Sequence, residues 1–222
     1  EELWAYIPGS LLGRLKELHT DVPGIFVDGS PKAYVDYAYD AYGKITGVNK
    51  AILIVGLRRG GEKYYALDVK DPLKPKFAWH IDSDISGYEY IAQSWSAPNI
   101  GKVKVGATDK WVAFIGGGYD DAQDDQGHHG ETEIDHVGRA VYVVDVLDGS
   151  LVWRYAYAEH PEMTYSIPSD IQKVDTNGDG KIDRLYVGDM GGRIWRFDLG
   201  DPDPLKWTGK IIFASNTGPS DK

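Results

Sequence analysis

The chain has 222 residues, with 34 acidic against 24 basic side chains and a formal net charge of −10. Such a surface repels phosphate backbones, so nucleic acid is a poor candidate partner. There is no cysteine, which excludes a disulfide-stapled scaffold but not a secreted protein, and no apolar run approaches the length of a membrane span.

The first part of the chain is expected to hold a strand and a short helix. Residues 3–7 are aromatic and aliphatic and resemble the strands that follow later. Because the chain begins abruptly at Glu1, it is expected to start inside a strand of a longer protein. Residues 11–18 carry leucines at helical spacing and predict one short helix.

Three similar units follow along the rest of the chain. Each unit begins with a short element that has Ser or Gly and then Pro. An apolar strand that ends in Gly follows, and after it comes an apolar strand that ends near an Asp. The first elements lie at 28–31, 95–98 and 165–168, the second at 51–56, 111–116 and 184–188, and the third at 64–69, 141–146 and 193–199. Repeated units of three or four antiparallel strands, rich in glycine and aromatics, indicate a solenoid or a β-propeller.

We predict an all-β chain in which residues 1–222 form a single β-propeller domain or a fragment of one. Closing a propeller takes about 4–8 blades of four-stranded antiparallel sheet, so three units form a partial propeller. Between the second and third units the spacing is 53 residues, from Asp145 to Asp198, but from Asp68 to Asp145 it is 77. This surplus predicts a polar insertion loop at about residues 119–137, on a face that such repeats often use for binding.

The insertion loop contains two groups of candidate metal ligands. A histidine-rich group could bind zinc or copper, although a solvated acidic loop is the simpler interpretation. It consists of His128, His129, Glu131, Glu133, Asp135 and His136. An aspartate group could hold a second Ca²⁺ but lacks alternating spacing and a turn glycine. It consists of Asp120, Asp121, Asp124 and Asp125.

The recurring Asp and Trp residues are predicted to be structural. Asp68, Asp145 and Asp198 close the repeats, and their recurrence favours turn capping through backbone N–H groups over catalysis, with Asp189 in a similar turn. The tryptophans are predicted to lie in the core. They are Trp79, Trp153 and Trp195. Nucleophilic catalysis has little support, because there is no cysteine and no Gly-x-Ser-x-Gly motif.

The strongest motif lies at residues 175–183, where oxygen-bearing side chains recur at alternate positions. Gly180 at position 6 suits the sharp turn of an EF-hand-type calcium loop, and Ca²⁺ prefers oxygen ligands. The predicted ligands are Asp175, Asn177, Asp179, the Lys181 carbonyl and Asp183.

This motif departs from an EF-hand in two ways. Position 12 is Tyr186 instead of a bidentate Glu, so Asp183 has to complete the ligand shell. The flanks, residues 171–174 and 184–188, have the composition of strands instead of helices. The sequence therefore predicts that a calcium ion holds the turn of a β-hairpin, which we call a calcium staple. A plain turn is the alternative, but three carboxylates so close together repel one another without a cation.

Two family resemblances accompany these motifs. The stretch 141–153 resembles the blade motif of pyrroloquinoline-quinone propellers, in which a Trp locks neighbouring blades together. The whole chain more closely resembles the C-terminal propeller domain of type IV pilus proteins of the PilY1/PilC family. That resemblance rests on residues 28–31 and 116–120 and on the calcium loop that runs into Gly-Asp-x-x-Gly-x-x-Trp-Arg-Phe-Asp at 188–198.

The PilY1/PilC resemblance implies a non-enzymatic protein. In that family the loop binds Ca²⁺ and controls pilus extension and retraction, and members act in twitching motility and adhesion to host or abiotic surfaces. The resemblance implies minor pilins as partners and a location at the bacterial cell surface, the pilus tip or the outer membrane. The chain has no Arg-Gly-Asp motif, so integrin binding is not implied. The alternative function is a quinone-dependent dehydrogenase propeller.

Overall fold

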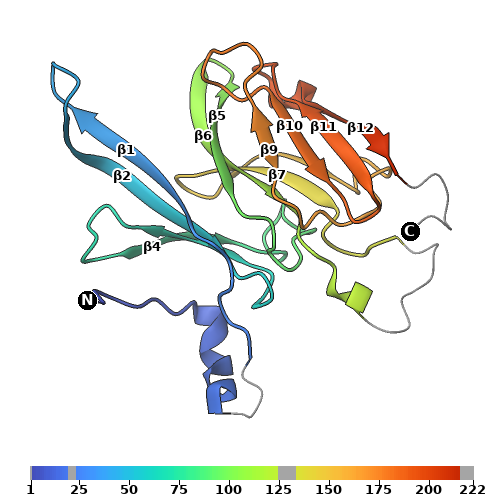
Figure 1. The fold of residues 1–222 in the computed structure, drawn as a ribbon, viewed down its shortest axis with the longest axis horizontal. Coiled ribbons are helices and arrows are strands. Elements are labelled where there is room, and N and C mark those ends of the chain that lie inside the picture. The colour runs from blue at the N-terminus through green and yellow to red at the C-terminus, as the bar shows by residue number, and fades with distance from the viewer. Residues whose placement is uncertain (1, 20–23, 125–133, 216–222) are drawn as a thin grey trace.

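The computed structural model of the chain describes residues 2–19, 24–124 and 134–215 and contains three four-stranded antiparallel sheets (Figure 1). Each sheet consists of four consecutive strands, as in a propeller blade. Blade 1 comprises β1 (Lys32–Tyr39), β2 (Ile45–Gly56), β3 (Tyr64–Asp68) and β4 (Lys76–Ile81). Blade 2 comprises β5 (Asn99–Val105), β6 (Thr108–Gly116), β7 (Ala140–Asp145) and β8 (Leu151–Ala156). Blade 3 comprises β9 (Gln172–Val174), β10 (Arg184–Gly188), β11 (Arg193–Asp198) and β12 (Thr208–Ala214).

The predicted all-β propeller class is confirmed, and the described blades form an open array. Gly56 and Gly116 end their strands because the loop that leads into the next blade passes over them. A Cβ at Gly116 would lie 2.2 Å from the Ile167 carbonyl oxygen, and one at Gly56 would lie 2.6 Å from the Ser94 carbonyl oxygen. The glycines that end these repeated strands therefore allow neighbouring blades to approach.

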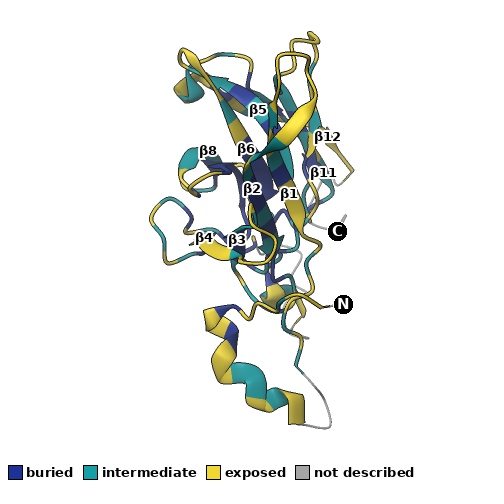
Figure 2. Ribbon diagram, turned by 90° about the vertical axis from the view of Figure 1, so that its left-hand side faces the viewer, coloured by how far each residue is buried: buried dark blue, intermediate teal, exposed yellow. Residues whose placement is uncertain are grey.

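The chain before blade 1 differs in part from the prediction. A helix is present as predicted, in the form of the 3-10 helix η1 (Gly9–His19), which is mostly exposed (Figure 2). The predicted strand at residues 3–7 is wrong: no described strand pairs with this segment, and the Trp4 indole donates to the Pro72 carbonyl at 2.8 Å. None of the helices in the described ranges is long and apolar enough to cross a lipid bilayer.

The core lies between the blades, and β7 contributes to both halves of it. Every residue of β7 is buried. Tyr142 and Val144 pack toward blade 1, whereas Val141 and Val143 pack toward blade 3. Because side chains alternate along a strand, β7 serves two hydrophobic clusters at once. This explains its uninterrupted apolar sequence.

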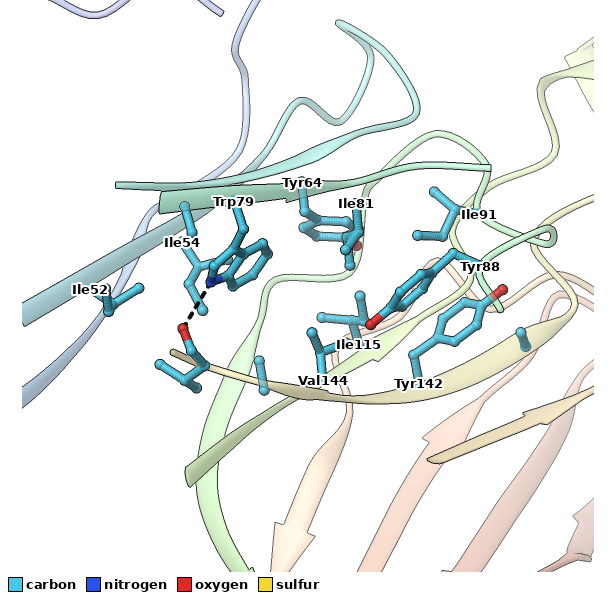
Figure 3. Packing of buried hydrophobic residues seen from close by; sticks show 14 of the residues in the cluster. Ile52, Ile54, Tyr64, Trp79, Ile81, Tyr88, Ile91, Ile115, Tyr142 and Val144 are labelled. Carbon is cyan, nitrogen blue, oxygen red and sulfur yellow. Dashed lines mark hydrogen bonds between the residues drawn. The ribbon is translucent and has the colours of Figure 1, made fainter. Parts of the chain in front are cut away.

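Two of the repeated tryptophans join neighbouring blades. The indole N–H of Trp79 on β4 donates to the Val146 carbonyl at the end of blade 2, at 2.9 Å (Figure 3). The ring of Trp153 on β8 makes edge contacts with Phe197 and Trp207 of blade 3, at 5.9 and 5.7 Å between centroids. The predicted core role is confirmed for Trp79, whereas Trp153 is partly buried and packs against the cluster between blades 2 and 3.

Trp195 has a different partner, inside its own blade. It is fully buried, as predicted, and its indole N–H donates to Asp189 Oδ2 at 2.7 Å. Asp189 also accepts from the Arg193 backbone N–H at 3.0 Å, which confirms its turn role. Burial raises the pKa of the Asp189 carboxyl, in spite of these hydrogen bonds.

The prediction for the repeat-closing aspartates is confirmed at Asp68 and Asp145. Each accepts a hydrogen bond from the backbone N–H two residues later, at 3.0 Å. Asp198 instead accepts from the Arg196 side chain at 2.6 Å and forms an ion pair with Arg184, whose Nε lies 3.3 Å from Asp198 Oδ1. The Leu199 N–H donates to the Asp183 carbonyl at 2.7 Å, just as the N–H groups of Val69 and Val146 donate to other carbonyls, so Asp198 differs in its arginine partners.

The Lys50–Asp68 pair predicts a small acid sensitivity. The Lys50 ammonium, 2.7 Å away, and the Lys70 N–H hold the pKa of Asp68 below its ordinary value. The pair therefore stabilises the fold above pH ~4 and loses this contribution as the pH falls through the lowered pKa. Since both side chains of the pair are partly exposed, we expect Asp68→Asn to lower the free energy of unfolding by at most about 1 kcal/mol at pH 7. Melting curves should show this difference vanishing in strong acid, and a difference that persists there would contradict the assignment.

Candidate metal site

The acidic loop 175–183 joins β9 to β10 in blade 3. Strands alternate in direction, so hairpin turns such as β9–β10 lie at one end of the blades, which we call the turn end. The links β2–β3, β4–β5, β6–β7 and β8–β9 lie at the opposite end, which we call the link end (Figure 1). Strands flank the loop on both sides, as predicted. The loop is closed by a hydrogen bond from the Asp183 N–H to the Val174 carbonyl at 3.1 Å.

The loop is also tied to blade 2. The Ile182 N–H donates to the Lys102 carbonyl on β5 at 2.7 Å. The Lys173 ammonium donates to the Ile100 carbonyl on the same strand. Desolvation lowers the pKa of this lysine. The loop therefore lies at the interface between blades 2 and 3, and a change in its conformation affects both blades.

Hydrogen bonds from the loop backbone to the side chains of three predicted ligands shape the loop. Asp175 accepts from the N–H groups of Gly178 and Gly180, at 2.7 and 2.8 Å. Asn177 and Asp179 each accept from the backbone N–H two residues later, at 2.9 Å. Gly178 and Gly180 have φ values of 77° and 80°, and a Cβ at either would point into open space, so glycine is required there for backbone conformation and not for room.

Asp183 reaches back to the start of the loop. Its Oδ2 accepts from the hydroxyl and the backbone N–H of Thr176, at 2.6 and 3.0 Å. This contact brings position 9 of the loop next to position 2. The role of Asp183 as the ligand that replaces a Glu at position 12 stays a prediction.

The donor set fits Ca²⁺ in its chemistry. Every candidate ligand is an oxygen, from a carboxylate, an amide or the Lys181 carbonyl. Backbone and side-chain hydrogen bonds from Lys181 hold the pKa of Asp179 below its ordinary value, so this carboxylate is ionised at neutral pH. In the described residues, no three acidic or histidine side chains converge closely enough to share an ion. The Lys181 ammonium instead lies 3.3 Å from Asp179 Oδ2. It therefore pairs with the carboxylate that a metal cation would bind.

The other predicted metal groups fall largely outside the described residues. This applies to His128, His129, Glu131, Glu133 and Asp125. The described members have protein partners. Buried Asp135 accepts from the Ser166 N–H at 2.6 Å, and Asp121 and Asp124 accept from Gln93 and Tyr119.

Buried Asp120 closes the base of the insertion loop. Its carboxylate accepts from the backbone N–H groups of Ala122, His136 and Val137, at 3.2, 2.7 and 3.3 Å. These bonds join the two ends of the loop across the link end. A structural role therefore accounts for Asp120, and zinc, copper or a second Ca²⁺ in this loop stays a prediction.

Sequence reasoning missed a pocket at the link end, lined by Arg59, Trp95 and Tyr119. The only local signal was the Arg58–Arg59 pair beside two glycines. The residues that meet there come from three separate links that are far apart in the sequence, so the pocket depends on the packing of the blades.

Comparison with known proteins gives one consistent relationship. A family model described as the PilY1 beta-propeller domain matches residues 5–216. The type IV pilus biogenesis factor PilY1 of Pseudomonas aeruginosa is 28% identical over 203 residues, which is 89% of this chain and 15% of that protein. A PilY1 homolog of Xylella fastidiosa is 27% identical over 220 residues, which is 93% of this chain and 13% of that protein.

A solved structure is also similar. The crystal structure of the Pseudomonas aeruginosa PilY1 C-terminal domain matches with a TM-score of 0.61 and 27% identity, covering 100% of this chain and 39% of that one. The chain thus spans less than half of that domain. It spans 15% or less of the two full-length relatives.

Proposed function

Because the chain belongs to the PilY1 β-propeller family, we propose that it forms part of a non-enzymatic, calcium-binding type IV pilus biogenesis factor. The names of its relatives support the pilus role. We propose that the full protein acts at the cell surface, the pilus tip or the outer membrane. There it binds minor pilins and supports pilus extension and retraction, twitching motility and adhesion to surfaces.

The observation that carries the calcium proposal is the winding of loop 175–183. Asn177 and Asp179 form Asx turns, Asp175 accepts from the N–H groups of Gly178 and Gly180, and both glycines have the positive φ that this winding requires. A bound Ca²⁺ supplies the positive charge that offsets repulsion among the loop carboxylates. For the ion to bind, Lys181 has to release Asp179 while its backbone carbonyl remains as a ligand.

If the cation orders this loop, it also stabilises the two segments that are hydrogen-bonded to the loop. The Ile182 N–H holds β5 of blade 2, and the Asp183 carbonyl accepts from Leu199 after β11. Without the cation, the carboxylates of Asp175, Asp179 and Asp183 repel one another and loosen these ties. Calcium therefore acts here as a staple at the seam between blades 2 and 3.

Calorimetry and thermal melting test the calcium site directly. At Ca²⁺ a hundredfold above Kd, ligand binding adds about 2.7 kcal/mol to the free energy of unfolding. For a chain of this size that raises Tm by roughly 5–10 °C relative to chelator. Asp179→Ala should abolish both the heat of binding and the shift in Tm. Lys181→Ala should strengthen binding, because it removes the competing ammonium and keeps the carbonyl.

Asp71→Ala is the matched control, since Asp71 caps an exposed Asx turn in blade 1, away from the loop. It should leave the calcium response unchanged. No heat on Ca²⁺ addition, with the same melting curve in chelator, would refute the calcium site. In cells, a full-length protein carrying Asp179→Ala should restore fewer extended pili than wild type to a strain that lacks the protein.

The dehydrogenase alternative is tested by adding quinone. A quinone site needs ligands from several blades around the axis, whereas the ligands proposed here come from one hairpin. We expect no change in the quinone absorbance spectrum on mixing. A saturable spectral change with turnover of an alcohol would overturn the non-enzymatic assignment.

A further inference from the structure

We propose that the link end of the blades carries a recognition pocket for a carboxylate of an acidic peptide segment. The pocket has a volume of about 680 Å³ and is open to solvent. It is lined by Ile25, Arg59, Gln93, Trp95, Tyr119, Asp124 and Pro168. These residues come from the segment before β1 and from the links at the end opposite the metal loop.

Two arginines converge on one indole in this pocket. The guanidinium carbons of Arg58 and Arg59 lie 4.7 and 5.6 Å from the centroid of the Trp95 ring. Arg59 lines the large cavity, and Arg58 lines a smaller one of about 130 Å³ that shares Trp95 as a wall. Stacking on an aromatic face leaves the edge of a guanidinium, with its N–H donors, directed away from the ring.

Neither arginine forms an ion pair with a carboxylate in the part of the chain that the structure describes. The Arg58 Nε is buried and has no hydrogen-bond partner among the described residues. Because this atom has almost no exposed surface, a ligand in the pocket would meet the guanidinium of Arg59, which lines it. In a chain with a net charge of −10, two guanidinium groups at one place therefore have no carboxylate partner among the described residues.

The backbone at Arg58 is strained in a way that supports a binding role. Its φ of 52° is the only positive value at a non-glycine residue among those described. Such a conformation costs about 1–3 kcal/mol and persists where the surroundings fix it. Here the Ser94 hydroxyl fixes it by accepting from the N–H groups of Leu57 and Arg58, at 2.8 and 3.1 Å.

The opposite wall of the pocket is equally fixed. Gln93 and Tyr119 exchange two backbone hydrogen bonds, at 3.0 and 3.2 Å, which join the link before β5 to the link after β6. The Gln93 side chain accepts from the Trp95 indole N–H at 3.0 Å, and the Tyr119 hydroxyl donates to Asp124 at 2.7 Å. The pocket is therefore preorganised, which reduces the entropy lost when a ligand binds.

The lining favours a peptide over other oxyanions. Arg59 can hold a carboxylate with two parallel hydrogen bonds. Asp124 can accept from the N–H groups of a peptide, and it repels a phosphate, with up to two negative charges, more strongly than a single carboxylate. Trp95 and Ile25 add apolar surface for a neighbouring side chain. The overall negative charge disfavours polyanions such as nucleic acids and anionic membranes more strongly than a short peptide with one or two carboxylates. The volume of the pocket suits a short peptide segment.

Fluorescence polarisation with a labelled pentapeptide that carries two glutamates and a phenylalanine tests the proposal. We expect saturable binding that weakens with added salt, and at least tenfold weaker binding when glutamines replace the glutamates. Arg59→Ala should weaken binding at least tenfold. Arg59 is exposed, so this variant should melt at the wild-type temperature.

Arg193→Ala is the matched control, because Arg193 also lies over a ring, that of Tyr165 at 4.6 Å, but does not line the pocket. It should bind the peptide as wild type does. Equal binding of the glutamine peptide, or no effect of Arg59→Ala, would overturn the proposal. Competition by free acetate or phosphate at the same concentration as unlabelled peptide would reduce the site to a simple anion site and overturn peptide recognition. The calcium titration is independent of all these outcomes.

Discussion

Replacing Trp79 with alanine is expected to lower the free energy of unfolding by about 3–5 kcal/mol, the usual cost of removing a large buried aromatic side chain. Trp79 is 6% exposed and packs in the cluster between blades 1 and 2. Its indole N–H is bonded to the Val146 carbonyl (Figure 3). The Gly149 backbone lies against the ring so closely that a Cβ there would be 2.8 Å from it. Urea unfolding followed by tryptophan fluorescence measures the loss.

Two variants separate the contributions to this interface. Trp79→Phe keeps a ring but loses the hydrogen bond, and should cost less than alanine does. Trp111→Ala removes a tryptophan that is 40% exposed, and should cost about 1 kcal/mol or less. Equal losses for Trp79→Ala and Trp111→Ala would show that Trp79 does not join the blades.

Asp120→Ala is expected to cost about 3 kcal/mol, because it leaves three backbone N–H groups without their charged acceptor. Asp120 is 3% exposed, and its carboxylate holds both ends of the insertion loop. The loop base should open, and limited proteolysis should then cut within residues 119–137 faster than in wild type. Chemical unfolding measures the accompanying loss of stability.

The neighbouring residue provides the control. Asp121 is exposed and accepts only from the Gln93 side chain among the described groups, so Asp121→Ala should change stability by less than about 0.5 kcal/mol. Asp120→Asn keeps the shape and one acceptor, and should fall between the two. If Asp120→Ala and Asp121→Ala are cut at the same rate, the carboxylate of Asp120 does not hold the loop closed.

Features set by local rules were predictable from the sequence. The Asx turns at Asp68 and Asp145 need only residues nearby in the chain, and the sharp turn at Gly180 needs only a residue that tolerates positive φ. The alternation of apolar residues located most of the strands. These features together were sufficient for the blade pattern.

Features that depend on distant partners were not predictable in this way. Residues 3–7 have the composition of a strand but lack a partner strand in the described chain. Asp198 looks like Asp68 in sequence, yet its carboxylate pairs with Arg184, which lies opposite it on the neighbouring strand. Ser94 fixes the strained Arg58 from 36 residues away. In the acidic loop, the spacing of Asp179 and Asp183 identified the candidate ligands but not the competing ammonium of Lys181.

Each blade consists of four consecutive strands, and this has a consequence for synthesis on the ribosome. Blade 1 can complete its hydrogen-bonded ladder while blade 2 is still being made, because all its pairings are local. Trp79, however, waits for Val146, 67 residues later. At about 5–20 residues per second, translation leaves the inner face of blade 1 uncovered for roughly 3–13 s. During that interval the nascent chain exposes an apolar sheet face that is prone to aggregate. This is the stage of synthesis at which a chaperone would be most needed.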